Sequence, residues 1–326
     1  ERGVYILFII SLITLSSLSI YILKFPTKLN NKGNFVLFSR EFSILLNNYF
    51  LMFVLTVVMV GTTYPILLSV FTSESISVGP QYYNTILAPF VFIFLILMAS
   101  GPLMNWNKNS FFSIKNKLFV FFVISVALTF LISFFVKEDG SIFLLGILCS
   151  LYLIISVFYE MFFYKKFVFI KLNFPRIFSH LGFGLLIMAI TLNYFFSREI
   201  TAKIYLGENF SSQDIGIKFL NSTSRQEKNF QELFGSYEIT KKNKVIVLNP
   251  SIRKYVQPQQ FTSETSIKND WFSDFYIAMD YASDATTGIG IRFYYNYFVR
   301  LIWVAFALIT IGGIFSLSIR KNEKKF

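Results

Sequence analysis

Seven apolar stretches, each long enough to cross a bilayer as a helix, constrain this chain more than any other feature. A bilayer core of about 30 Å takes about 20 apolar residues in a helix. Backbone amides in hydrocarbon must be bonded internally, so runs of this length favour helices over strands. The predicted spans are Val4–Leu23, Tyr49–Phe71, Tyr83–Trp106, Leu118–Val136, Ile142–Tyr164, Phe174–Phe196 and Phe298–Ile319.

Basic residues are concentrated in alternate loops, which predicts the direction of each crossing. The loops after the first, third and fifth spans and the C-terminal tail, together with Arg176 at the start of the sixth span, carry fifteen Lys and Arg residues. The two short loops between them carry only Lys137. Basic loops stay on the cytoplasmic or matrix side, so the segment between the last two spans is expected to face outward. The net charge of +12 arises mainly from these inner loops, and no nucleic-acid partner is expected.

The segment between the sixth and seventh spans has short alternating runs separated by turn-like clusters such as GENFSSQD and SDATTG. This pattern predicts a small antiparallel sandwich or barrel with a platform or docking role. We therefore predict an α-helical polytopic membrane protein: a six-helix bundle at 1–196, an outward β domain at 197–297, and a last span with a basic tail at 298–326. The predicted strands are Ile200–Leu206, Ile215–Leu220, Tyr237–Thr240, Lys244–Leu248, Phe275–Met279 and Ile289–Tyr294.

His180, the single histidine, is the strongest candidate for a functional residue. It lies within the sixth span, where an ionisable side chain is costly and usually faces a bundle interior or a ligand. Arg176 and Gly184 share its helical face, and the small residues Ser179, Gly182 and Gly184 leave room for a flat group such as haem. The alternative is a hydrogen bond from the imidazole to another helix, with the glycines serving close packing.

A low-spin b-type haem between membrane helices takes two axial histidines, so a second ligand would come from outside this chain. The single Cys149 excludes an internal disulfide and a cysteine-based metal site. Metal ligation by His180 is therefore the one cofactor chemistry that the sequence suggests, and no catalytic residue is identified.

Several segments, taken together in order and spacing, resemble the later half of the CcmF family. That family provides the haem lyase of the cytochrome c maturation system in bacteria and some mitochondria. The resemblance extends from residue 1 to about residue 317. It is carried by SREFSILLNN, GTTYP, ISVGPQYYN, SHLGF, VLNPSIRKYVQPQQFTSETSI and FVRLIWVAFALITIGGIF.

The resemblance implies a protein that takes haem from a haem chaperone and attaches it to the CxxCH thiols of apocytochrome c. It also implies a b-type haem between two membrane histidines, with quinol as a candidate electron source. His180, in SHLGF, matches the second of these histidines. The family's Trp-rich segment, its first membrane histidine and its outer histidines precede the part seen here, so an N-terminal part of the lyase is an expected partner.

Three further residues are candidates with simpler structural alternatives. Gly61 and Pro65 of GTTYP are expected to break the end of the second span, with Tyr64 as an interfacial anchor or as a wall of the haem or apocytochrome site. Arg176 is expected either to contact a haem propionate or to act only as an inner-loop charge. Glu160 is expected to pair with a neighbouring lysine at 165 or 166, with a proton path as the alternative.

The composition, rich in Phe, Ile, Asn, Lys and Tyr, resembles translation of an AT-rich genome. It favours the mitochondrial inner membrane, with the bacterial plasma membrane as the alternative. The rival to the lyase is a non-catalytic scaffold subunit of a larger inner-membrane respiratory assembly. A small-molecule transporter is disfavoured because neither inverted repeats nor an acidic pair at mid-membrane is evident.

Overall fold

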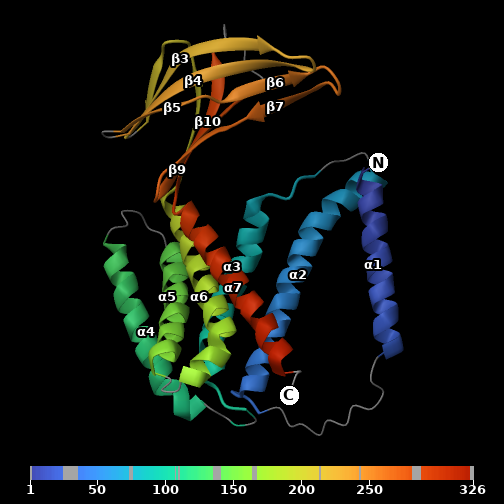
Figure 1. Ribbon diagram of the computed structural model, residues 1–326, viewed down its shortest axis with the longest axis vertical. Helices are drawn as coiled ribbons and strands as arrows, with labels where there is room; N and C mark the ends of the chain where they lie inside the picture. The colour runs from blue at the N-terminus through green and yellow to red at the C-terminus, as the bar shows by residue number, and fades with distance from the viewer. Residues whose placement is uncertain are drawn as a thin grey trace. The chain divides into compact units, whose positions relative to one another are not determined.

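The computed structural model describes residues 2–24, 36–72, 76–106, 108, 111–134, 141–163, 167–212, 214–241, 244–280 and 288–323 (Figure 1). The chain divides into two compact units. The first comprises Glu1–Asp139 and Leu144–His180, and the second comprises Gly140–Phe143 and Leu181–Phe326.

Seven helices among the described residues are long and apolar enough to cross a membrane, which confirms the predicted polytopic class. The first unit contains the first four of them, most of the fifth and the first part of the sixth, together with a short 3-10 turn, η1. The helices are α1 (Arg2–Lys24), α2 (Arg40–Phe71), α3 (Pro80–Ser100), η1 (Gly101–Leu103), α4 (Phe111–Ser133), α5 (Ser141–Phe163), α6 (Phe167–Phe196) and α7 (Val299–Glu323).

Helix α2 differs from its prediction in two features, its first residue and the expected break at Pro65. It begins at Arg40, nine residues before the predicted start at Tyr49, because the Ser39 side chain caps it by accepting a hydrogen bond from the Phe42 N–H at 3.3 Å. A polar first turn is invisible to a search for apolar runs. The predicted break at Pro65 is also wrong, since the helix continues to Phe71. Membrane helices tolerate an internal proline where neighbouring groups compensate for the lost hydrogen bond.

Aromatic and small residues pack α2 against α3 within the first unit. The rings of Phe53 and Phe90 lie 4.1 Å apart between centroids. Gly61 lies directly under Tyr83, where an added Cβ would stand 2.6 Å from the phenol oxygen. Helix α5 joins α3 through the buried Ser156 hydroxyl, which donates to the Ala99 carbonyl at 2.7 Å. The expected helix end at GTTYP is thus a site of close packing between α2 and α3.

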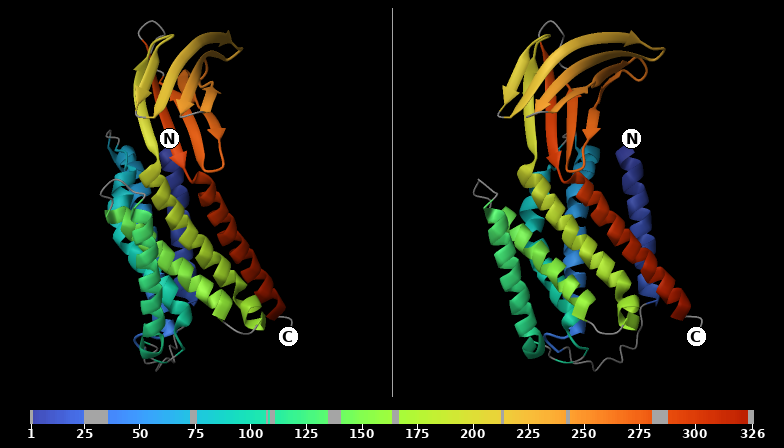
Figure 2. Two further views of the ribbon diagram at one scale, coloured as in Figure 1. Left: turned by 90° about the vertical axis from the view of Figure 1, so that its left-hand side faces the viewer. Right: turned by 60° about the vertical axis from the view of Figure 1, so that its left-hand side comes forward.

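The second unit contains a β domain between α6 and α7, and its described strands form two antiparallel sheets (Figures 1 and 2). One sheet has the order β1-β10-β9-β8. The other has the order β2-β3-β4-β6-β7, with β5 also paired to β4. The strands are β1 (Arg198–Ile204), β2 (Asn209–Ser212), β3 (Ile215–Gln226), β4 (Phe230–Lys241), β5 (Lys244–Leu248), β6 (Ser251–Tyr255), β7 (Gln260–Glu264), β8 (Ser266–Asn269), β9 (Ser273–Met279) and β10 (Ile289–Tyr297).

All six predicted strands are present, but β2, β6, β7 and β8 were not predicted. The polar strands β7 (QFTSE) and β8 (SIKN) expose most of their residues, so neither carries the alternation that marks a half-buried strand. These strands form because their neighbours supply hydrogen-bonding edges. The antiparallel prediction is therefore confirmed, and the predicted number of strands was too low.

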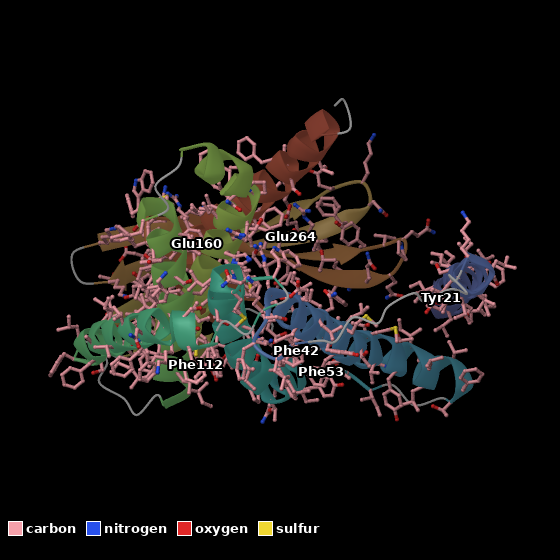
Figure 3. All side chains as sticks on the ribbon, turned by 90° about the horizontal axis from the view of Figure 1, so that it is seen from below. Tyr21, Phe42, Phe53, Phe112, Glu160 and Glu264 are labelled. Carbon is pink, nitrogen blue, oxygen red and sulfur yellow. The ribbon has the colours of Figure 1, made fainter. Side chains whose placement is uncertain are left out.

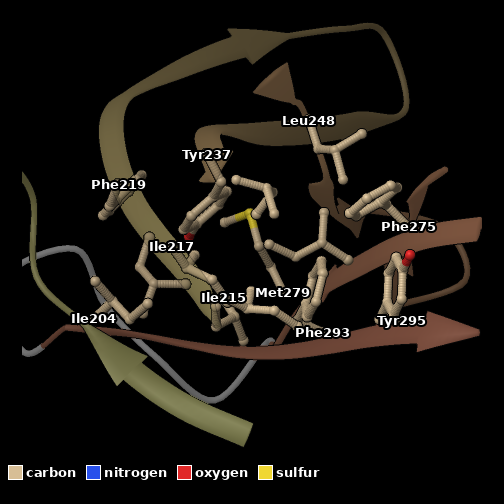
Figure 4. Close-up of a cluster of buried hydrophobic side chains, with 14 of the residues drawn as sticks. Ile204, Ile215, Ile217, Phe219, Tyr237, Leu248, Phe275, Met279, Phe293 and Tyr295 are labelled. Atoms are coloured by element: carbon tan, nitrogen blue, oxygen red, sulfur yellow. The ribbon is translucent and has the colours of Figure 1, made fainter. Parts of the chain in front are cut away.

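The core of the β domain is formed by alternate residues of facing strands (Figure 4). In β3, Ile215, Ile217 and Phe219 are buried at every second position, as the period of two in a strand requires. Phe219 stacks on Tyr237 of β4 with ring centroids 4.6 Å apart. Phe293 of β10 is completely buried in the same cluster.

A buried carboxylate lies at one edge of this domain. Glu232 of β4 accepts hydrogen bonds from the Ser251 hydroxyl at 2.7 Å and from the Arg253 Nε at 2.8 Å. Burial raises the pKa of the Glu232 carboxyl, but the hydrogen bonds and the guanidinium charge outweigh burial and hold the pKa below its ordinary value. The network joins β4 to β6 through charge-assisted bonds.

Candidate functional site

The candidate site is built on α6, the helix that carries His180. Helix α6 begins at Phe167, seven residues before the predicted start, and passes through Pro175 without ending. His180 lies 16 residues before the last residue of the helix, which corresponds to about 24 Å along the axis at 1.5 Å per residue. The imidazole is half-buried. It therefore lies well inside the membrane span and far from the end of α6 that leads to the β domain.

Two of the other predicted site residues share the His180 face of α6. Arg176 lies one turn before His180 and Gly184 one turn after it, because residues four apart stand above one another on a helix. Gly184 is buried. One face of α6, called the His180 stripe, therefore carries in order a guanidinium, an imidazole and a buried glycine.

Arg176 is held by an ion pair within the first unit. Its Nη2 donates to the Glu160 Oε1 of α5 at 3.1 Å, and Glu160 is only 4% exposed. Figure 3 labels the Glu160 side chain. Among the described residues the partner of Glu160 is Arg176, which the sequence analysis did not identify. The predicted pairing with a lysine at 165 or 166 falls on residues outside the described ones. Hydropathy cannot find this contact because it depends on which helices are neighbours.

The Arg176 guanidinium retains an unused donor. Its Nε is buried, and within the described part of the chain it has no hydrogen-bond partner. A buried donor without an acceptor costs about 1–3 kcal/mol. An anionic oxygen close to the His180 stripe would remove that cost. Arg176 can therefore do more than serve as an inner-loop charge.

A second positive charge acts on Glu160 and was not identified from the sequence. Arg40, at the start of α2, interacts electrostatically with the Glu160 carboxylate. Its guanidinium also lies 5.0 Å from the centroid of the Trp106 ring. Two guanidinium groups thus act on one buried carboxylate. The capping serine that begins α2 was the available signal, because it places Arg40 in the first turn of a helix.

Gly182 does not provide room for a ligand, contrary to the expectation from the sequence. In the second unit an added Cβ at Gly182 would lie 2.8 Å from the Ala305 carbonyl oxygen and 3.0 Å from the Ile309 nitrogen, both in α7. Close packing between helices is therefore the role of this glycine. Within the described residues His180 makes no hydrogen bond, and both of its predicted roles stay predictions.

Tyr64 lies on α2 with half of its side chain exposed, and so belongs neither to the ion pair nor to the stripe on α6. An aromatic side chain at this exposure suits an interfacial anchor. Among the described residues, no group of three or more His, Cys, Asp and Glu side chains forms a metal site. The chemistry that this arrangement can support is ligation by a single imidazole beside an arginine donor.

Comparison with known proteins gives consistent results. Residues 195–297 match the family model described as the CcmF C-terminal beta-sandwich. The chain is 25% identical over 334 residues to the cytochrome c-type biogenesis protein CycK of Bradyrhizobium diazoefficiens, covering 98% of this chain and 50% of the relative. It is 24% identical over 331 residues to CcmF of Haemophilus influenzae, covering 98% of this chain and 51% of the relative.

A solved structure named cytochrome c heme lyase CcmF has the same fold, with a TM-score of 0.65 and 18% identity, over 85% of this chain and 45% of that chain. The chain spans about half the length of the curated relatives that it matches. The three comparisons therefore agree that this chain is similar to proteins named CcmF or CycK.

Proposed function

We propose that this chain belongs to the CcmF family and forms the C-terminal part of a haem lyase that attaches haem to apocytochrome c. We also propose that it holds a b-type haem in the membrane. The relatives are named cytochrome c-type biogenesis proteins, and the similar solved structure is named a haem lyase. Because about half of each relative is matched, the complete reaction is assigned to this chain together with an N-terminal part.

The observation that carries the haem proposal is His180 on α6. It is an imidazole without a hydrogen-bond partner in the described part of the chain, half-buried inside a membrane span. An ionisable side chain at this depth carries a free-energy cost, and such residues usually have a functional role such as binding a ligand. Ligation by a histidine imidazole is one of the ways in which proteins hold haem iron.

The surrounding residues fit haem on one side. The unused Nε donor of Arg176 suits a propionate, and the Glu160 carboxylate orients the guanidinium from the other side. Gly184, which carries no side chain, follows His180 on the same helical face, whereas the face at Gly182 is occupied by α7. The sequence contains one histidine, so the second axial histidine would come from the N-terminal part.

Haem bound here would supply one-electron redox chemistry, with quinol as a candidate donor. This chain would ligate the iron, hold a propionate and exclude water by its apolar spans. The end of α6 that leads to the β domain lies about 24 Å along the helix from His180. Haem attachment at the side of the β domain would therefore occur away from His180. The β domain would serve as a docking platform for the haem chaperone and apocytochrome c.

The proposed location is the mitochondrial inner membrane, with the bacterial plasma membrane as the alternative. The basic loops support an orientation in which the β domain faces the intermembrane or periplasmic space. The AT-rich composition supports the mitochondrial location over the bacterial one. Protease protection of a tag placed in the β domain, in sealed vesicles of known orientation, would test the topology.

The test of the haem proposal is a reduced-minus-oxidised optical spectrum of the purified native assembly, before and after His180→Ala. We expect a b-type band that disappears in the variant and returns in part when imidazole is added. Ser179→Ala is the matched control, since its side chain points about 100° away on the same helix. A band unchanged in His180→Ala would refute ligation. The absence of any band in the native assembly would leave the scaffold role as the better account.

A further inference from the structure

The β8–β9 loop, Asp270–Phe272, carries two large aromatic side chains that the fold does not bury. Trp271 is 80% exposed and Phe272 is 72% exposed. The loop is closed by a hydrogen bond from the Asp270 N–H to the Ser273 carbonyl at 2.8 Å. A loop this tight is usually polar, and neither aromatic ring is needed for the closure. Two adjacent exposed aromatics therefore call for an apolar partner outside the β domain.

The loop is attached to the start of a membrane span. The N–H of Phe298 donates to the Phe272 carbonyl at 2.8 Å, and α7 begins at the next residue. The Arg300 guanidinium, in the first turn of α7, lies 5.1 Å from the centroid of the Trp271 ring. Trp271 and Phe272 thus lie beside the residue at which the chain enters the membrane.

The end of α6 lies at the same level as the start of α7. The Asn193 side chain of α6 donates to the Tyr297 carbonyl at 2.6 Å, and the Tyr297 N–H donates to the Ser197 hydroxyl at 3.1 Å. Tyr194, in the last turn of α6, is largely exposed. Two helix ends and the loop therefore define one level, and exposed aromatic residues gather there as in an interfacial belt.

We propose that the β8–β9 loop is a membrane anchor, with Trp271 and Phe272 inserted at the boundary between the lipid headgroups and acyl chains. Trp suits this position because its ring is largely apolar while its N–H can bond to water or a headgroup. Arg300 places a positive charge beside the Trp271 ring, at the level where lipid phosphates would lie. The loop is continuous with the membrane spans, which favours lipid over a protein partner as its occupant.

An anchor of this kind would restrain the β domain. The two connections to α6 and α7 are joined to each other by hydrogen bonds and act as one attachment line. A contact at the β8–β9 loop adds a point of support on one side of that line. Rotation of the β domain about its two connections to α6 and α7 would then require both aromatic rings to leave the headgroup region of the membrane.

Tryptophan fluorescence can test the anchor, because the chain has only three Trp residues. The full-length protein carrying W106F and W303F, and therefore Trp271 as the single Trp of this chain, would be reconstituted in phosphatidylcholine vesicles with brominated acyl chains. We expect the largest loss of Trp271 emission with bromines placed just below the headgroups, and a smaller loss with bromines near the bilayer centre. We also expect protection from acrylamide.

Leu206→Trp in a chain without the natural Trp residues is the matched control. Leu206 is 60% exposed in the turn after β1, and β1 starts two residues after α6 ends. At about 3.3 Å per residue, this turn lies on the order of 25 Å along the strand from the membrane end. We expect the emission of the tryptophan introduced by Leu206→Trp to be lost to acrylamide and unaffected by brominated lipid.

The proposal would be overturned if Trp271 emission were quenched by acrylamide and unaffected by brominated lipid, as expected for the Leu206→Trp control. Protection from acrylamide without quenching by any brominated lipid would also overturn it, and would indicate a protein partner on the loop. If the single-Trp chain fails to fold, quenching by brominated lipid is compared between the natural protein and W271F. A quenched component that is absent from W271F supports the proposal, and equal quenching in both contradicts it.

Discussion

A pair of glycine substitutions tests whether Gly182 packs α6 against α7 or clears space for a cofactor. In Gly182→Ala the new methyl would stand 2.8 Å from the Ala305 carbonyl oxygen and 3.0 Å from the Ile309 nitrogen. Both are backbone atoms, so no side-chain rotation relieves the contact. The two helices would have to separate locally.

Gly313→Ala is the matched control, because Gly313 lies on α7 and an added Cβ there meets no atom within 4 Å. Exchanging glycine for alanine inside a helix is worth about 0.5–1 kcal/mol in favour of the folded state. This gain is common to both variants. The added methyl at Gly182 also overpacks a filled contact, at a cost of about 1–3 kcal/mol. The difference in unfolding free energy between the variants should therefore be about 1–3 kcal/mol.

The assay is reversible unfolding in lipid bicelles, followed by tryptophan emission, with haem content measured in parallel. We expect Gly182→Ala to be the less stable variant and Gly313→Ala to be as stable as the natural protein or more so. Equal stability of the two variants would refute the packing role. Loss of haem from Gly182→Ala without loss of stability would instead assign Gly182 to clearance for the cofactor.

Three more changes have definite expected outcomes. Glu160→Gln should lower the unfolding free energy by about 3 kcal/mol, because it leaves the Arg176 charge without its carboxylate partner. This value is near the lower end of the range for breaking a buried ion pair. Phe293→Ala should cost the β domain about 3–5 kcal/mol, since the ring is completely buried, and thermal unfolding would measure this. Glu232 has a lowered pKa when folded, so its stabilisation is full above the ordinary carboxylate range and is lost as the pH falls through the lowered pKa. Glu232→Gln should therefore flatten the decline of thermal stability in acid.

Each of these changes has a control with the same chemistry at an exposed position. Glu264→Gln removes an exposed carboxylate that pairs with Arg253 at 3.4 Å, and should cost at most about 1 kcal/mol. Val245→Ala truncates an exposed apolar side chain and should change stability by less than about 0.5 kcal/mol. Equal effects at buried and exposed positions would contradict the described packing. Acid sensitivity unchanged in Glu232→Gln would show that other carboxylates govern it.

Local patterns in the chain were sufficient for the class of the fold. A helix in hydrocarbon satisfies its own backbone, so apolar length alone predicts a span, and all seven spans were found. In the β domain, strands with buried residues at every second position, such as Ile289–Tyr294 in β10, were also recognised. The position of His180 on a span, with Arg176 and Gly184 on its face, follows from the helical repeat.

Contacts between elements could not be read from these patterns. The polar start of α2 at Arg40 and its passage through Pro65 depend on a cap and on neighbouring helices. The polar strand β7 is a strand because β6 offers it a hydrogen-bonding edge. The anchoring position of Trp271 depends on a hydrogen bond between the adjacent Phe272 and the residue before α7.

The sequence by itself determined that this chain crosses a membrane, where its β domain begins, and which residue is the candidate ligand. Each of these depends on apolar length, alternation or the presence of a single imidazole, which are properties of neighbouring residues in the chain. Only the tertiary structure decided that Glu160 pairs with Arg176, that α7 occupies the face at Gly182, and that one donor of Arg176 is unused. Helices of similar hydropathy do not reveal which of their faces meet, because lipid and protein are equally apolar partners.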